Sequence, residues 1–80
     1  MIWEPVPLVD GVDAICFRKG HYLASAKRDG VYYAWNIHCR REDGTLKTLN
    51  PIRFELADSP NVAQGLAWAD DQLAGYEQSC

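Results

Sequence analysis

The sequence predicts an α+β domain in which a four-stranded antiparallel meander is followed by one C-terminal helix packed on one face of the sheet. Three observations predict this fold class. The pairs Asp29-Gly30 and Asp43-Gly44 are typical of tight hairpin turns. Residues 31–39, between them, alternate with the period of two of a strand that buries one face. Residues 59–77 are rich in alanine and carry apolar residues at helical spacing.

The 80 residues indicate one domain, and the hydrophobic fraction of 48% argues against disorder. Residues 1–11 contain Pro5 and Pro7, and proline lacks the N–H group that a central strand needs. We therefore expect an extended lead there, or at best an edge strand, before a sheet formed by residues 12–56.

The turns set the expected register of the sheet. Residues 12–18 form the first strand, and Lys19-Gly20 turns the chain into the second. A type I′ turn at Asp29-Gly30 pairs Arg28 with Val31, Ala26 with Tyr33, Ala24 with Trp35, Tyr22 with Ile37 and His21 with His38. A second two-residue turn at Asp43-Gly44 pairs Trp35 with Ile52, Tyr33 with Phe54 and Val31 with Leu56. Both turns place apolar residues on the same buried face, and Pro51 suggests an edge strand or a bulge.

The helix is expected to begin at Ser59, a favoured N-cap residue, with Pro60 at the first helical position. The apolar stripe that should cover the sheet consists of Val62, Leu66, Ala69, Leu73 and Tyr76. Gly65 costs about 1 kcal/mol relative to alanine in helix propensity. We therefore expect it to let the helix approach Trp35 or Tyr33 closely.

Several classes of protein and site are not indicated. No apolar run approaches the roughly 18 residues of a membrane span, and the start at Met1 lacks the features of a signal peptide, so we expect a cytoplasmic protein. Cys16, Cys39 and Cys80 form no C-x-x-C pair, so we predict no disulfide framework, metal site or cofactor. Cys80 is an incidental thiol or a link between two chains. No catalytic motif is present, so we do not expect an enzyme.

The charges are unevenly distributed along the chain, whose net charge is −3. All eight lysines and arginines lie between Arg18 and Arg53. The outer face of the sheet is expected to carry Arg18, His21, Leu23, Lys27, Tyr32, His38, Arg40, Lys47, Leu49 and Arg53. A basic face with an aromatic residue is suited to single-stranded nucleic acid, and the alternative is an ordinary solvated face. His21 and His38 should lie opposite each other, but a zinc site needs further ligands.

The C-terminal segment forms an acidic surface that is a candidate for binding a protein partner. Trp68 lies off the apolar stripe of the helix, next to two aspartates, and partly exposed tryptophans anchor many interfaces. The candidate partner-binding residues are Asp58, Trp68, Asp70, Asp71 and Glu77. The alternative is that Trp68 folds over the edge of the core.

The aromatic-rich meander, the Asp-Gly turns and the Ser-Pro helix start resemble small orphan proteins of phages and mobile elements, among them the anti-CRISPR proteins. The likeness is in size and organisation, and no functional residue is carried over from it. It implies a non-enzymatic inhibitor that binds a bacterial CRISPR surveillance complex and blocks its DNA binding. Two alternatives stay open: a single-stranded nucleic-acid-binding module that uses the basic sheet face, and a homodimeric structural phage protein.

Overall fold

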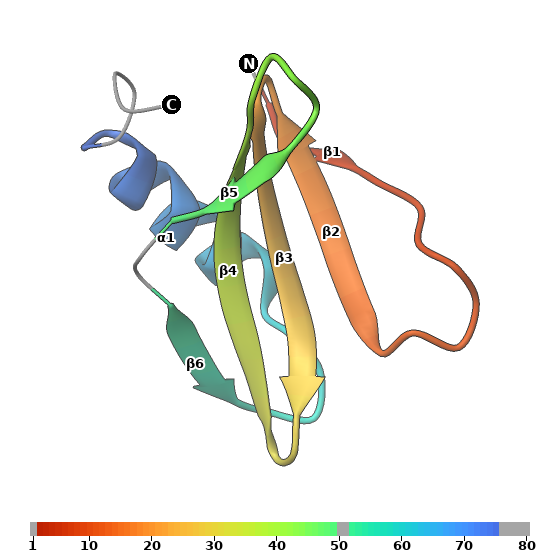
Figure 1. Cartoon of the computed structure of the whole chain (residues 1–80). Coiled ribbons are helices and arrows are strands. Elements are labelled where there is room, and N and C mark those ends of the chain that lie inside the picture. The colour runs from red at the N-terminus through yellow and green to blue at the C-terminus, as the bar shows by residue number, and fades with distance from the viewer. Residues whose placement is uncertain (1, 50–51, 76–80) are drawn as a thin grey trace.

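The computed structural model describes residues 2–49 and 52–75, which form an antiparallel sheet and one helix (Figure 1). The elements are β1 (Glu4–Pro5), β2 (Ala14–Lys19), β3 (Tyr22–Asp29), β4 (Tyr32–Arg40), β5 (Leu46–Thr48), β6 (Arg53–Leu56) and α1 (Val62–Leu73). The sheet runs in the order β1-β2-β3-β4-β5, and β6 pairs with the other half of β4. The predicted α+β meander is thus confirmed, with its last strand divided into β5 and β6. The predicted edge strand in the lead is β1.

The β3–β4 hairpin turns one position later than predicted. Asp29 pairs with Tyr32, so Gly30 and Val31 form the two-residue loop. Gly30 has φ +66° and Val31 has a negative φ, which is the pattern of a type II′ turn rather than type I′. The predicted pairs of this hairpin are therefore wrong by two residues. Because side chains alternate with a period of two, this offset leaves the predicted faces of β3 and β4 unchanged.

The predicted pairing of the last strand is wrong by one residue. β4 pairs Trp35 with Arg53 and Ala34 with Phe54, where the sequence predicted Trp35 opposite Ile52. A shift of one residue inverts the faces of a strand. Arg53 and Glu55 consequently lie on the helix side of the sheet, and Phe54 lies on the opposite side. Pro51, where a bulge was expected, lies outside the described residues.

Arg53 and Glu55, the two charged residues of β6, face the helix side because both contact the start of the helix. The Arg53 guanidinium donates to Oε1 of Gln64 at 3.4 Å, and Oε1 of Glu55 accepts from the backbone N–H of Asn61 at 2.5 Å. Asn61 is the N-cap, and its side chain accepts from the N–H of Gln64 at 3.1 Å. The helix therefore begins at Val62, later than the predicted start at Ser59. It ends at Leu73, and residues 76–80 lie outside the described part.

The core lies between α1 and the sheet, where Trp35, Ile37 and Cys39 of β4 are fully buried. Gly65 of α1 lies directly against the indole of Trp35, as the sequence predicted. A Cβ at this position would lie 2.6 Å from Cη2 of Trp35, which is too close for any larger residue. Leu49, expected on the outer face, is buried in the core instead.

Candidate functional site

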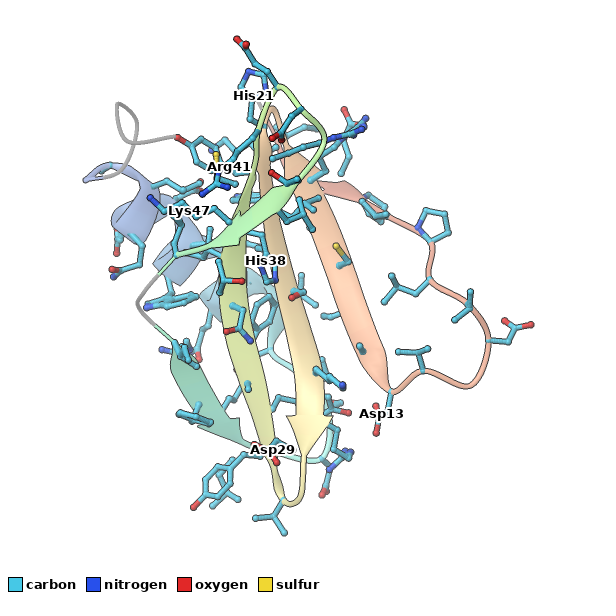
Figure 2. The ribbon with its side chains drawn as sticks, in the orientation of Figure 1. Asp13, His21, Asp29, His38, Arg41 and Lys47 are labelled. Carbon is cyan, nitrogen blue, oxygen red and sulfur yellow. The ribbon has the colours of Figure 1, made fainter. Side chains whose placement is uncertain are left out.

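The sheet face opposite α1, here called the open face, is not covered by the helix (Figure 1). It bears the residues of each strand that alternate with the core positions. Figure 2 shows His38 near the middle of this face, Asp29 at one end, and His21 and Arg41 at the other. From the register, its larger side chains are Glu4, Arg18, Leu23, Lys27, Asp29, Tyr32, Asn36, His38, Arg40, Leu46, Phe54 and Leu56.

Tyr32, Phe54 and Leu56 lie at one end of the open face, and Ile52 lies just before β6; these four exposed apolar residues are here called the apolar strip. Their exposed fractions are 44%, 60%, 70% and 50% in that order. The rings of Tyr32 and Phe54 meet edge to face, with centroids 6.3 Å apart. The sequence pattern predicted Ile52, Phe54 and Leu56 on the buried face. These residues alternate with charged ones, and in such a strand the apolar positions are normally buried. The contacts of Arg53 and Glu55 with the helix start reverse that preference.

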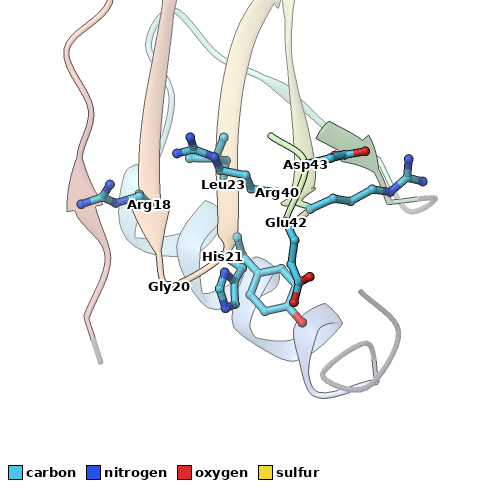
Figure 3. Close-up of a pocket in the computed structure, with 9 residues that line it drawn as sticks. Arg18, Gly20, His21, Leu23, Arg40, Glu42 and Asp43 are labelled. Carbon is cyan, nitrogen blue, oxygen red and sulfur yellow. The ribbon is translucent and has the colours of Figure 1, made fainter. Parts of the chain in front are cut away.

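The other end of the open face is a basic hollow with a volume of about 860 Å³. Figure 3 shows Arg18, Leu23 and Arg40 on three neighbouring strands, with Glu42 and Asp43 beside Arg40. The lining of the hollow consists of Arg18, Gly20, His21, Tyr22, Leu23, Arg40, Arg41, Glu42 and Asp43. Three arginines and a histidine thus surround a concave surface that contains two carboxylates.

The carboxylate of Asp43 is occupied within its own turn. Its Oδ1 accepts from the backbone N–H of Thr45 at 2.9 Å and from the Thr45 hydroxyl at 2.6 Å. These bonds, together with the charge of Arg41, hold the pKa of Asp43 below its usual value. Asp43 therefore stays ionised as part of the turn, and its bonded oxygen is directed at Thr45.

The predicted basic face is only partly assembled. Arg18, Lys27, Tyr32, His38 and Arg40 lie on the open face as expected. Two predictions were wrong, because Lys47 and Arg53 have the parity of the helix side. His21 lies in the β2–β3 turn, where it lines the basic hollow at the end of the open face.

His21 and His38 do not face each other, because Leu23 occupies the position opposite His38. The imidazole of His38 instead lies between two hydroxyls, with Nδ1 3.0 Å from Oγ1 of Thr48 and Nε2 3.4 Å from Oγ of Ser25. Burial lowers the pKa of His38. Within residues 2–49 and 52–75, no group of three or more His, Cys, Asp or Glu side chains is placed to hold a metal ion.

Of the acidic residues proposed for partner binding, Asp70 contacts other parts of the chain. Oδ1 of Asp70 accepts from Nε1 of Trp3 at 3.0 Å and from Nζ of Lys19 at 2.6 Å. Trp68 is half-buried and packs against both core clusters, as the alternative interpretation of this residue expected. Asp58 and Asp71 are exposed, and Glu77 lies outside the described residues.

A second polar cluster on the helix side joins β3 and β4 to Asp13, just before β2, and Asp58, after β6. The Arg28 guanidinium donates to Oδ2 of Asp13 at 2.6 Å, to the Tyr33 hydroxyl at 3.0 Å and to the backbone carbonyl of Asp58 at 2.8 Å. The Tyr33 hydroxyl donates to Oδ1 of Asp13 at 3.0 Å. The hydrogen bond to Asp13 is the main reason that the pKa of Arg28 is raised. This cluster ties the chain before α1 to the sheet, so we interpret it as structural.

The chain matches no protein-family model, no curated protein and no solved structure at a significant level. Among the described residues, the one helix is too short and too polar to cross a bilayer. The surfaces themselves are therefore the basis for inferring function.

Proposed function

We propose that this chain is a non-enzymatic protein-binding domain that contacts its partner through the open face, with the apolar strip at the centre of the contact. The observation that carries the proposal is the joint exposure of Tyr32, Phe54 and Leu56 at one end of the face, with Ile52 exposed just before β6. Contiguous exposed apolar surface of this kind is typical of protein interaction sites.

The energetics favour a partner on this strip. Fully burying a leucine, isoleucine or phenylalanine side chain contributes roughly 1.5–3 kcal/mol relative to leaving it in water. Aromatic residues near the centre of an interface commonly contribute most to binding, and Tyr32 and Phe54 already hold each other in place. The strip replaces the acidic helix surface as the preferred contact, because Trp68 is engaged in packing the core.

The identity of the partner is a more specific proposal. A subunit of a bacterial CRISPR surveillance complex, bound in the cytoplasm of the host, is the partner that the resemblance in size and organisation implies. Affinity capture from a lysate that contains such complexes, with nuclease treatment, tests it. A stoichiometric effector subunit that survives the nuclease supports this partner, and recovery of unrelated proteins alone contradicts it.

The surface is tested with paired variants. Phe54→Asp and Leu56→Asp should each reduce capture of the partner about tenfold or more, since each places a charge where an apolar contact is buried. Val9→Asp is the matched control, because Val9 is 77% exposed but lies in the loop before β2. Capture that survives both substitutions would overturn the assignment of the strip. A dimer of the wild-type chain that the same substitutions dissociate would identify the partner as a second copy.

A second candidate function is binding of single-stranded nucleic acid on the open face. Phe54, which the sequence placed in the core, joins Tyr32 as a second aromatic on this face, and Lys27 lies on the neighbouring strand. Bases stack on such pairs while lysines contact phosphates. Salt-dependent binding of an oligothymidylate that Lys27→Glu weakens would support this function. No binding at low salt would eliminate it.

A further inference from the structure

The two ends of the open face have different chemistry, and this difference constrains the partner. The apolar strip surrounds Tyr32 at the start of β4, and the basic hollow surrounds Arg40 at its end. The eight residue steps between them correspond to about 26 Å at the rise of an extended strand. A partner that covers the open face must therefore satisfy an apolar region and a basic region a fixed distance apart.

The basic side chains on the two sides of the sheet differ in whether they form ion pairs. On the helix side, Lys19 pairs with Asp70 and Arg28 pairs with Asp13, each at 2.6 Å. Arg18, at the hollow, makes no side-chain hydrogen bond or ion pair within residues 2–49 and 52–75. The acids nearest to the helix side are thus used internally, whereas on the open face Arg18 lies opposite Glu4 without forming an ion pair with it.

The two carboxylates at the hollow, Glu42 and Asp43, offset only part of the charge of its three arginines. The Asp43 carboxylate is bonded to Thr45, and the Arg41 guanidinium forms no ion pair within the described residues. An arginine side chain presents five N–H donors that match a carboxylate with two parallel hydrogen bonds. The hollow is therefore suited to receive carboxylates supplied by another molecule.

We propose that the basic hollow binds an acidic segment of the protein partner, whose carboxylates pair with Arg18 and Arg41 while its apolar residues cover the strip. This inference rests on the proposed protein-binding function and adds the charge of the partner. A protein is favoured over a nucleic acid because aliphatic Leu46, Ile52 and Leu56 make up much of the exposed apolar surface. Bases stack on aromatic rings, whereas aliphatic side chains are the usual contacts of another protein.

A peptide titration followed by NMR tests the hollow directly. Hexaglutamate at low salt should shift the backbone amide signals of Gly20 and His21, because both residues line the hollow. The double variant Arg18→Glu and Arg41→Glu should weaken this binding about tenfold or more. Lys27→Glu is the control for a single charge reversal, since Lys27 lies on the open face outside the hollow. Hexaglutamate that leaves these signals unmoved overturns the proposal.

A parallel titration separates the two chemistries. An eight-residue oligothymidylate that binds the hollow more tightly than hexaglutamate would overturn the carboxylate assignment in favour of phosphate. Capture of the protein partner then tests the protein-binding function separately from the acidic segment. If Phe54→Asp abolishes capture and the double arginine variant does not, the protein-binding function stands and the acidic segment is refuted.

Discussion

The backbone of Gly65 in α1 lies against the indole ring of Trp35 in β4, and a Cβ added at Gly65 would lie 2.6 Å from Cη2 of that ring. Trp35 is fully buried, so its ring has no vacant space to move into. Helix propensity alone favours alanine over glycine by about 1 kcal/mol. The close approach therefore reverses the expected sign of a glycine-to-alanine substitution.

The Gly65→Ala variant should lower the free energy of unfolding by about 1–3 kcal/mol, because overpacking at Trp35 outweighs the gain in propensity. Urea denaturation measures the change. Ala67→Gly is the control, since Ala67 is exposed on the same helix and should lose only about 1 kcal/mol. A Gly65→Ala protein that is more stable than the wild type would contradict the close approach.

Gly30 provides a contrasting prediction, because an added Cβ there would meet nothing within 4 Å. Gly30→Ala should still destabilise the protein by about 1 kcal/mol, since its φ of +66° is unfavourable for alanine. Asp29→Ala should have a smaller effect, because Asp29 belongs to β3 and not to the loop. Thermal unfolding of the two variants compares them. A larger loss at Asp29 would indicate the type I′ turn that the sequence suggested.

The pairing of Asp70 with Lys19 and Trp3 ties the N-terminal lead and β2 to the helix. Asp70→Asn should lower stability by no more than about 1 kcal/mol, since the Asp70 side chain is 46% exposed and such pairs are screened by water. Asp71→Asn, an adjacent exposed position, is the control. The Trp3 indole should also become more mobile, which time-resolved fluorescence anisotropy detects. A loss of several kcal/mol would mean that this contact is far stronger than its exposure implies.

The His38 imidazole makes stability depend on pH, because burial lowers its pKa from the ordinary value of 6.5. Between the lowered folded pKa and 6.5, the unfolded chain binds the proton more readily than the folded chain. Stability therefore rises with pH in this range, and it falls as the pH drops below about 6.5. His38→Gln should flatten the dependence of the urea midpoint on pH below about pH 6.5. An unchanged dependence in this variant would show that other groups cause it.

Alternation in the sequence was enough to predict which side of the sheet a residue faces in some strands. It was not enough in a strand whose register is set by a turn or by a tertiary contact. The buried faces of β3 and β4 are as predicted, although the Asp29-Gly30 turn was misplaced, because an offset of two preserves the alternation. The face of β6 was predicted incorrectly, because its register follows a longer connection after β5 and its charged residues contact the helix start. The apolar strip, and with it the candidate site, depends on that one-residue difference.

The stability of Phe54 variants decides between the two registers. In the structure Phe54 is 60% exposed, so Phe54→Ala should change the free energy of unfolding by less than about 1 kcal/mol. In the register that the sequence suggested, Phe54 would lie in the core, and the same substitution would cost about 3–5 kcal/mol. Ile37→Ala, at a fully buried position of β4, serves as the reference and should cost about 2–5 kcal/mol. A Phe54→Ala protein as unstable as the Ile37→Ala protein would place Phe54 inside and remove the apolar strip from the open face. A near-wild-type protein would leave Phe54 available to a partner, and any loss of binding in its variants could then be assigned to the contact itself.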